Sequence, residues 1–279
     1  MPTFTAPDGT RLAYRESGDG DPLICVPGGP TDSRYLGDLG GLSAHRRLIV
    51  LDLRGTGRSD VPADPSSYRC DRLVDDVEAL RAHLGLARAD LLGHSAGTNV
   101  VTQYVARFPE RVGKVALIGP STRAVGIEID GEARREVARG REGEAWFADA
   151  WPVLDSLTRG GDGGGDPGAI APFFYGRWDA AAQAHHAAFG RPENAEAVRV
   201  FGAPGAFSPA ATRAGIAAWA GPVLLLTGEF DVNSPPGATE RFASLFPAAG
   251  CEVQAGAGHY PWVDAAEAFT GAVSSFLRA

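Results

Sequence analysis

A serine, an aspartate and a histidine of this 279-residue chain each come shortly after a short apolar run. The serine, Ser95, is the central residue of Gly93-His94-Ser95-Ala96-Gly97, which matches the pattern G-x-S-x-G. An apolar run leads into this motif and a helical pattern follows it. A serine in such a strand-to-helix turn has a strained backbone that exposes its hydroxyl, and the glycines leave room for the tight turn. We therefore predict that Ser95 is the nucleophile of an acyl-transfer reaction.

A serine hydroxyl becomes a good nucleophile only when a neighbouring base takes its proton. We predict that His259 is this base and that Asp231 orients the histidine, because the order serine, acid, histidine is one of the known triad orders. Both residues follow predicted strands, so both are expected at the carboxyl edge of the sheet, where α/β sheets bind ligands. Glu229, two residues before Asp231, is the alternative acid.

A glycine-rich turn, Gly28-Gly29-Pro30, follows another apolar run. In serine enzymes of this kind, two backbone N–H groups stabilise the negative charge that develops on the substrate's carbonyl oxygen. We predict that Gly29 and Ala96 supply these two donors, which form the oxyanion hole. The alternative is an ordinary Gly-Pro turn without a role in chemistry.

Three other histidines, one in the motif around Ser95 and two in the region between residues 121 and 220, have simpler interpretations. His94 lies inside the G-x-S-x-G motif and is predicted to be a packing or hydrogen-bonding neighbour rather than the base. His185 and His186 are expected to be exposed at the surface rather than bound to a metal.

The elements that must position these residues follow from the hydrophobic pattern. Short apolar runs separated by helical stretches predict a parallel sheet of an α/β protein. The six runs are 22–26, 47–53, 90–93, 114–118, 223–227 and 251–254. An additional pair, 4–6 and 11–14, flanks Asp8-Gly9 and predicts a hairpin, which makes eight strands.

The strand pattern is interrupted between residues 121 and 220, where helical pieces and a glycine-rich tract occur. Because strands resume directly afterwards, we predict a core made of residues 1–120 and 221–279, with residues 121–220 inserted as a helical cap that covers the site. The alternative is a separate helical domain that is not a lid.

Several motifs together resemble the α/β-hydrolase superfamily, and most closely its proline iminopeptidase-like branch. They are Pro27-Gly28-Gly29-Pro30, Asp52 to Ser59, Gly93 to Gly97, Gly228 to Asp231 and Gly258 to Trp262. The resemblance implies the α/β-hydrolase fold: a mostly parallel eight-stranded sheet with helices on both faces and an inserted helical cap. It also implies that Ser95, Asp231 and His259 form the catalytic triad of a serine hydrolase.

The chain departs from that branch at positions that bear on its substrate. Pro27 and Thr31 replace a histidine and a glycine of the branch's usual motif, and His94 and Ala96 replace a glycine and a tryptophan at the nucleophile. Members of the branch use cap carboxylates to bind a free α-amine, and the spacing singles out none of the available acids, Asp179, Glu193 and Glu196.

These departures favour hydrolysis of an ester, a thioester or a lactone, with an amide also possible, through an acyl-enzyme intermediate. The first alternative is an aminopeptidase of the proline iminopeptidase type. The second is a non-catalytic protein that binds a small ligand on the same fold.

Composition narrows the range of partners. The net charge is −8, and the basic residues are scattered, with Lys114 the only lysine, so a nucleic acid is not expected as a partner. No apolar stretch approaches about 18 residues, so no membrane span is expected. The N-terminus has no signal-peptide pattern and the cysteine count is odd, which favours the cytoplasm. No metal-ligand cluster or nucleotide motif occurs, so we expect no metal and no cofactor, and a small-molecule substrate as the partner.

Overall fold

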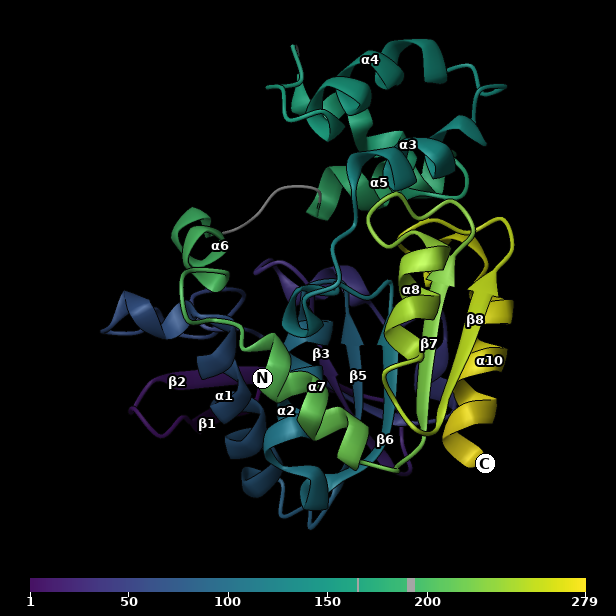
Figure 1. Cartoon of the computed structure of the whole chain (residues 1–279). Coiled ribbons are helices and arrows are strands. Elements are labelled where there is room, and N and C mark those ends of the chain that lie inside the picture. The colour runs from purple at the N-terminus through teal and green to yellow at the C-terminus, as the bar shows by residue number, and fades with distance from the viewer. Residues whose placement is uncertain (165, 190–193) are drawn as a thin grey trace.

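The computed structural model describes residues 1–164, 166–189 and 194–279, and its centre is one eight-stranded sheet (Figure 1). The strands are β1 (Thr3–Thr5), β2 (Arg11–Ser17), β3 (Pro22–Val26), β4 (Arg47–Leu51), β5 (Ala89–His94), β6 (Val112–Ile118), β7 (Val223–Gly228) and β8 (Ala249–Gln254). Their spatial order is β1-β2-β4-β3-β5-β6-β7-β8. The pairs β1–β2 and β2–β4 are antiparallel and all others are parallel, which confirms the predicted sheet.

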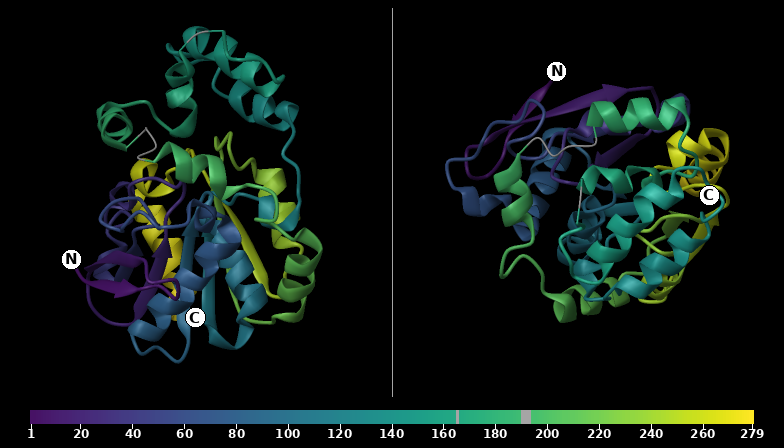
Figure 2. Two further views of the ribbon diagram at one scale, coloured as in Figure 1. Left: turned by 90° about the vertical axis from the view of Figure 1, so that its left-hand side faces the viewer. Right: turned by 90° about the horizontal axis from the view of Figure 1, so that it is seen from above.

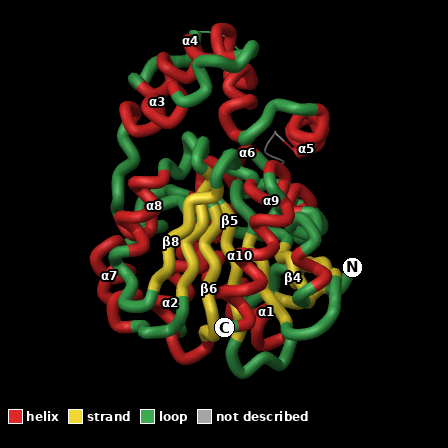
Figure 3. The backbone as a smooth tube through the Cα atoms, turned by 90° about the vertical axis from the view of Figure 1, so that its right-hand side faces the viewer, coloured by secondary structure: helices red, strands yellow, loops and turns green. Residues whose placement is uncertain are grey.

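Both faces of the sheet are covered, which explains why its strands are continuous apolar runs. Successive residues of a strand point to opposite faces, so Ile24 packs in one core cluster and Cys25 in the other. Helices α1 (Cys70–His83), α2 (Gly97–Arg107), α7 (Pro209–Ala218) and α8 (Pro236–Ala243) cover the first face. Helices α9 (Pro261–Asp264) and α10 (Ala266–Arg278) cover the second face (Figure 3). The short turns η1 (Ser33–Leu36) and η2 (Leu42–Ala44) pack on the same face.

Between β6 and β7 the described residues form helices and loops and no strand. They are η5 (Arg123–Val125), α3 (Gly131–Arg139), α4 (Phe147–Thr158), η6 (Pro167–Phe174), α5 (Ala180–Phe189), α6 (Ala195–Phe201) and α7. Helices α3, α4 and α5 stand beyond the edge of the sheet at which the parallel strands end (Figures 1 and 2). Helix α7 instead packs against α2 on the face of the sheet. The inserted region therefore contributes to both parts of the molecule.

A small apolar cluster joins the inserted helices to the sheet domain. Ala138 of α3, Leu154 of α4 and Phe173 of η6 pack together and include Val232, which follows β7. Burial of these side chains holds α3 and α4 over the loop that carries Asp231. None of the helices within the described ranges is long and apolar enough to span a bilayer.

The turn after β4 is held by a buried ion pair. Arg54 donates to both carboxylate oxygens of Asp76 in α1, with an Nε–Oδ2 distance of 2.7 Å. Burial outweighs the nearby guanidinium and raises the pKa of Asp76 to about 6. Further along the same turn, the Ser59 hydroxyl donates to the carbonyl of Asp52 at 2.7 Å. These bonds fix the shape of the loop from Asp52 to Ser59.

Two further short turns, η3 (Pro65–Tyr68) and η4 (Pro109–Arg111), complete the set of described elements.

Candidate active site

The turn between β5 and α2 has the geometry that the G-x-S-x-G motif predicts. Ser95 has a φ of 51°, in the left-handed region; Leu39 is the other described non-glycine residue with a positive φ. A Cβ on Gly97 would lie 2.4 Å from the carbonyl oxygen of Pro27, and a Cβ on Gly93 would lie 3.0 Å from Cα of Thr98. The two glycines are therefore required by the close approach of β3 and α2 to the turn.

Backbone hydrogen bonds hold Ser95 in this strained conformation. Its N–H donates to the carbonyl of Ile118 at 3.0 Å, and its carbonyl accepts from the N–H of Thr98 at 3.1 Å and from the Thr98 hydroxyl at 2.6 Å. Strain of this kind persists only where the surroundings determine the backbone, and it occurs mainly at functional sites. The first turn of α2, which begins beside Ser95, adds the positive end of a helix dipole.

The loops after β7 and β8 bring Asp231 and His259 together. The distance from His259 Nδ1 to Asp231 Oδ2 is 2.8 Å, and both side chains are buried. The other carboxylate oxygen, Oδ1, accepts from the N–H groups of Asn233 at 2.8 Å and Ser234 at 2.9 Å. With the carboxylate accepting at Nδ1, that nitrogen carries the proton, and Nε2 is left as the basic nitrogen.

The alternative acid lies elsewhere. The side chain of Glu229 accepts from the N–H of Gly256 at 2.8 Å at an exposed site.

Gly119 packs tightly against the Asp231–His259 pair. A Cβ at this position would lie 3.1 Å from both Asp231 Oδ2 and His259 Nδ1.

The inserted region touches the histidine loop directly. The N–H of His259 donates to the carbonyl of Phe174 at 2.8 Å, and a Cβ on Gly176 would lie 1.9 Å from the carbonyl oxygen of Gly256. The side chain of Asp264 accepts from the N–H of Gly258 at 2.8 Å, and burial raises the pKa of this carboxyl. The backbone after η6 and the histidine loop are thus packed as one unit.

A chain of hydrogen bonds runs from the glycine-rich turn to the histidine loop. The N–H of Gly28 donates to the hydroxyl of Tyr35 at 2.7 Å, and this hydroxyl lies 2.6 Å from Nδ1 of His94. His94 Nε2 lies 2.9 Å from the carbonyl oxygen of His259, which can only accept, so Nε2 carries a proton and donates to it. In a neutral ring Nδ1 then has no proton and accepts from the Tyr35 hydroxyl. His94 is therefore a hydrogen-bonding neighbour, as its position in the motif suggests.

This arrangement requires a neutral His94. Burial lowers the pKa of His94 well below its usual 6.5, and the nearby His259 lowers it further. A folded-state pKa below the unfolded value means that the unfolded chain binds the extra proton first. The free energy of unfolding therefore falls as the pH drops below about 6.5, by up to about 1.4 kcal/mol per pH unit for one such group.

We expect the variant His94→Gln to lose less unfolding free energy than the wild type between pH 7.5 and 5.5. Denaturant titrations at the two pH values measure this difference. A matched variant, His83→Gln, removes a histidine at the end of α1 and is expected to behave as the wild type does. Equal losses in the wild type and His94→Gln would contradict a neutral, buried His94.

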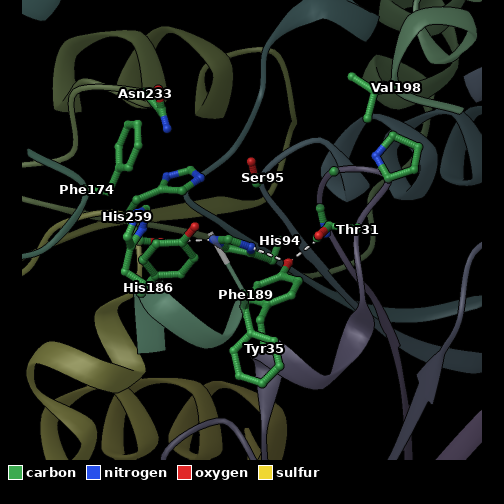
Figure 4. A pocket seen from close by; sticks show the side chains of 14 residues that line it. Thr31, Tyr35, His94, Ser95, Phe174, His186, Phe189, Val198, Asn233 and His259 are labelled. Carbon is green, nitrogen blue, oxygen red and sulfur yellow. Dashed lines mark hydrogen bonds between the residues drawn. The ribbon is translucent and has the colours of Figure 1, made fainter. Parts of the chain in front are cut away.

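A pocket of about 280 Å³ opens above the turn that carries Ser95 (Figure 4). Of the predicted residues, Ser95, His259 and Gly29 line it, and Ala96 lines the adjoining hollow together with Ser95 and Gly29. Asp231 lies behind His259. The structure adds side chains that the sequence did not indicate: Tyr35, Phe174, His186, Phe189, Val198, Asn233 and Tyr260. Most are aromatic, and they come from η1, the inserted helices and the loops after β7 and β8.

Asp179 and Glu196, two of the three cap carboxylates considered for binding an amine, do not line this pocket. Asp179 is exposed and accepts from the N–H groups of Ala181 and Ala182 at the start of α5. Glu196 is exposed and pairs with Arg199 at 3.3 Å. Glu193 lies outside the described residues. No aspartate or glutamate is present among the described residues that line the pocket. In the same described part of the chain, no three metal-ligating side chains gather into a group.

The chain belongs to the α/β-hydrolase fold family, whose sequence profile matches residues 21–266. A 120-residue segment is 36% identical to a proline iminopeptidase of Heyndrickxia coagulans. This segment is 42% of the chain and 42% of that relative, so less than half of the curated relative's length is matched. The predicted resemblance and the predicted fold are confirmed.

Solved structures resemble the chain over nearly its whole length. An esterase of Thermogutta terrifontis is 26% identical and superposes with a TM-score of 0.70, covering 99% of this chain and 97% of that one. A putative aryl esterase of Burkholderia cenocepacia is also 26% identical, with a TM-score of 0.69 and the same coverage. These two structures are named as esterases, whereas the curated sequence relative is named as a proline iminopeptidase.

Proposed function

We propose that the chain is a serine hydrolase that cleaves an ester, a thioester or a lactone of a small molecule. The observation that carries the proposal is the geometry of the site: a strained Ser95 lines the same pocket as His259, and His259 is paired with the buried Asp231 at 2.8 Å. The similarity to two esterases supports the same reaction class. A ligand-binding protein without chemistry has no need of a carboxylate-oriented histidine beside a strained serine.

In the proposed reaction, Nε2 of His259 takes the proton of the Ser95 hydroxyl as Oγ attacks the carbonyl carbon of the substrate. Asp231 keeps the Nδ1 proton in place and stabilises the imidazolium that forms. The imidazolium then protonates the leaving alcohol or thiol, which leaves an acyl group on Ser95. A water molecule, deprotonated by His259, attacks this acyl group, and the acid is released as Ser95 regains its proton.

The backbone N–H groups of Gly29 and Ala96 are the proposed oxyanion hole. Gly29 is in the turn after β3, and Ala96 is the residue directly before α2. Both line the hollow that Ser95 also lines. A fixed donor of this type contributes about 3–4 kcal/mol to the transition state. The hydrogen bond from Gly28 to Tyr35 and the one between Tyr35 and His94 help to hold the glycine-rich turn in place.

We also propose that the inserted residues act as a cap over the site. Phe174, His186 and Phe189 come from this region and line the pocket, so their position determines what can enter (Figure 4). The proposed cap comprises α3 to α6 and η6, whereas α7 packs with the sheet domain.

Substrate class is the property in which the two leading functions differ. A free α-amine needs a carboxylate to offset its loss of water, and the described lining of the aromatic pocket offers none. The two acids of the adjoining hollow, Glu128 and Asp130, are exposed to solvent, and Asp130 already accepts from the N–H of Ala133. We therefore expect faster turnover of short-chain or aromatic esters than of prolyl amides. Comparing kcat/KM for p-nitrophenyl butyrate and proline p-nitroanilide measures this preference.

A control for the greater intrinsic reactivity of activated esters is the pair of unactivated substrates methyl butyrate and proline amide, assayed in the same way. A preference for the prolyl substrate in either pair would overturn the ester proposal and restore the aminopeptidase. The curated relative named as a proline iminopeptidase is the specific observation that keeps this second function in view.

A further inference from the structure

Two hollows meet at Ser95. One is the aromatic pocket of about 280 Å³, and the other, of about 910 Å³, lies between η5, α3, α6 and the loop after β7. Gly29, Ser95, Val198 and Asn233 line both. A substrate bound with its ester at Ser95 can therefore extend one part into each hollow. The larger one contains a charged group that the proposed reaction does not use, Arg134 of α3.

The guanidinium of Arg134 is held in place, but the described residues give it no ion-pair partner. Nη1 donates to the carbonyl of Val232 at 3.0 Å and to Oδ1 of Asn233 at 3.3 Å. Across the described ranges, no carboxylate oxygen lies within 4.0 Å of it, and none of those residues accepts from Nε or Nη2. Its neighbour on the helix, Arg135, shows the usual arrangement, with Glu132 at 2.7 Å and Asp155 at 3.7 Å.

Partial burial makes the lack of an ion-pair partner among the described residues energetically unfavourable. Arg134 is half-buried, and the loss of water around it lowers its pKa, an effect that the buried Asp231 partly opposes. A cation taken out of water without an ion-pair partner is destabilising unless an anion joins it. The guanidinium has a planar fork of donors that matches a carboxylate in a two-point contact.

The other charges of this hollow are more exposed and are already engaged. Arg123 is exposed, and its guanidinium lies over the ring of Phe207 at 4.8 Å. Asp130 accepts from the N–H of Ala133 and so caps α3, and Glu128 is exposed to solvent. Among the described charged residues that line the hollow, Arg134 is the one that combines partial burial with unused donors.

We propose that Arg134 binds a carboxylate of the substrate, and that the preferred substrates are esters or lactones that also carry a free acid. This inference rests on the proposed hydrolase function. Arg134 is anchored to Val232 and Asn233, the two residues after Asp231, so the subsite is built on the loop that carries the acid of the triad. A cation here also repels a substrate's ammonium group, in agreement with the expected rejection of prolyl amides.

The test uses pairs of esters that differ in one carboxylate. Acyl-side pairs are the monomethyl esters of succinate, adipate and suberate, each against the methyl ester of the monocarboxylic acid of equal chain length. An alcohol-side pair is 4-acetoxybenzoate against 4-methylphenyl acetate. Rates are followed in a pH-stat for the wild type, Arg134→Gln, Arg134→Lys and Arg123→Gln.

We expect kcat/KM of Arg134→Gln to fall at least tenfold, chiefly through KM, for the carboxylated member of at least one pair. The neutral members should change less than threefold. The tenfold loss corresponds to about 1.4 kcal/mol, within the range for a hydrogen bond to a charged group. Arg134→Lys, which keeps the charge but not the fork, should retain part of the activity, and Arg123→Gln should match the wild type.

Equal losses on carboxylated and neutral esters would show that Arg134 only supports the Asp231 loop, and would overturn the proposal. An equal loss of kcat/KM in Arg123→Gln would show that any nearby positive charge produces the effect, and would also overturn the proposal. If no ester is hydrolysed, the hydrolase function fails instead. Calorimetric titration of adipate and 4-hydroxybenzoate into the wild type and Arg134→Gln then decides the subsite alone, since binding lost in the variant supports it and unchanged or absent binding refutes it.

Discussion

Replacement of Ser95 by alanine is expected to abolish ester hydrolysis while the fold persists. The variant removes the only atom proposed to bond covalently to the substrate, and loss of such a nucleophile lowers kcat by about 10⁶ in a comparable triad. The variant should unfold within a few degrees of the wild type, because the β5–α2 turn is held by backbone bonds from Ser95 N–H and carbonyl that alanine also makes.

The measurement is the rate of p-nitrophenyl butyrate hydrolysis, with circular dichroism as the check of folding. Ser121→Ala is the matched control, because Ser121 lies in the hollow next to Ser95 and has no proposed part in the reaction. Retention of more than a tenth of the wild-type rate by Ser95→Ala would remove Ser95 as the nucleophile.

Replacement of Asp231 by asparagine is expected to lower kcat by about 10⁴, as substitutions of a triad aspartate do elsewhere. The carboxylate accepts from His259 Nδ1 and from two backbone N–H groups. An asparagine placed there can direct its NH₂ group at Nδ1, which stabilises the tautomer with the proton on Nε2. In that tautomer Nε2 of His259 carries the proton and has no lone pair to accept the proton of Ser95.

The control for this second experiment is Glu229→Gln, the other acid that the sequence offered. Its carboxylate bonds to Gly256 at the surface, and we expect kcat within threefold of the wild type. A loss in Glu229→Gln as large as that in Asp231→Asn would show that the orienting acid has been misassigned.

The sheet and the tight turn at Ser95 were predictable because local patterns determine them. Buried parallel strands such as β3 and β7 are short apolar runs, whose ends the sequence marks with glycine or proline. The β5–α2 turn was predictable because its glycines have a steric cause: a Cβ on Gly97 would lie 2.4 Å from the carbonyl oxygen of Pro27. Chain order then sufficed to propose Asp231 and His259 as partners.

The lining of the site was not predictable, because it depends on contacts between distant segments. Tyr35 bonds to both Gly28 and His94, and His94 lies 59 positions beyond Tyr35. His94 in turn bonds to His259, which lies another 165 positions along the chain. No local pattern in η1 distinguishes Tyr35 from an ordinary core aromatic residue. Arg134 was likewise invisible, because Arg135 beside it has the same residue type and an ordinary ion pair.

One expectation about the inserted region was wrong. His185 and His186 were both expected to be exposed, but both are half-buried, and His186 lines the pocket. Nδ1 of His185 lies 2.8 Å from the Tyr175 hydroxyl and Nε2 lies 2.9 Å from the carbonyl of Tyr35. Burial lowers the pKa of His185. The error arose because α5 is a mostly alanine-containing helix whose weak hydrophobic pattern does not show which side faces the core.

The central claim is that Ser95 is an activated nucleophile, and covalent labelling tests it most directly. A fluorophosphonate reacts with a serine only when a base assists the hydroxyl. We predict that the wild type gains the mass of one phosphonyl group per chain by intact-mass spectrometry, that peptide mapping places it on Ser95, and that Ser95→Ala gains none. A folded wild type that remains unlabelled, or a label on another residue that persists in Ser95→Ala, would contradict the account.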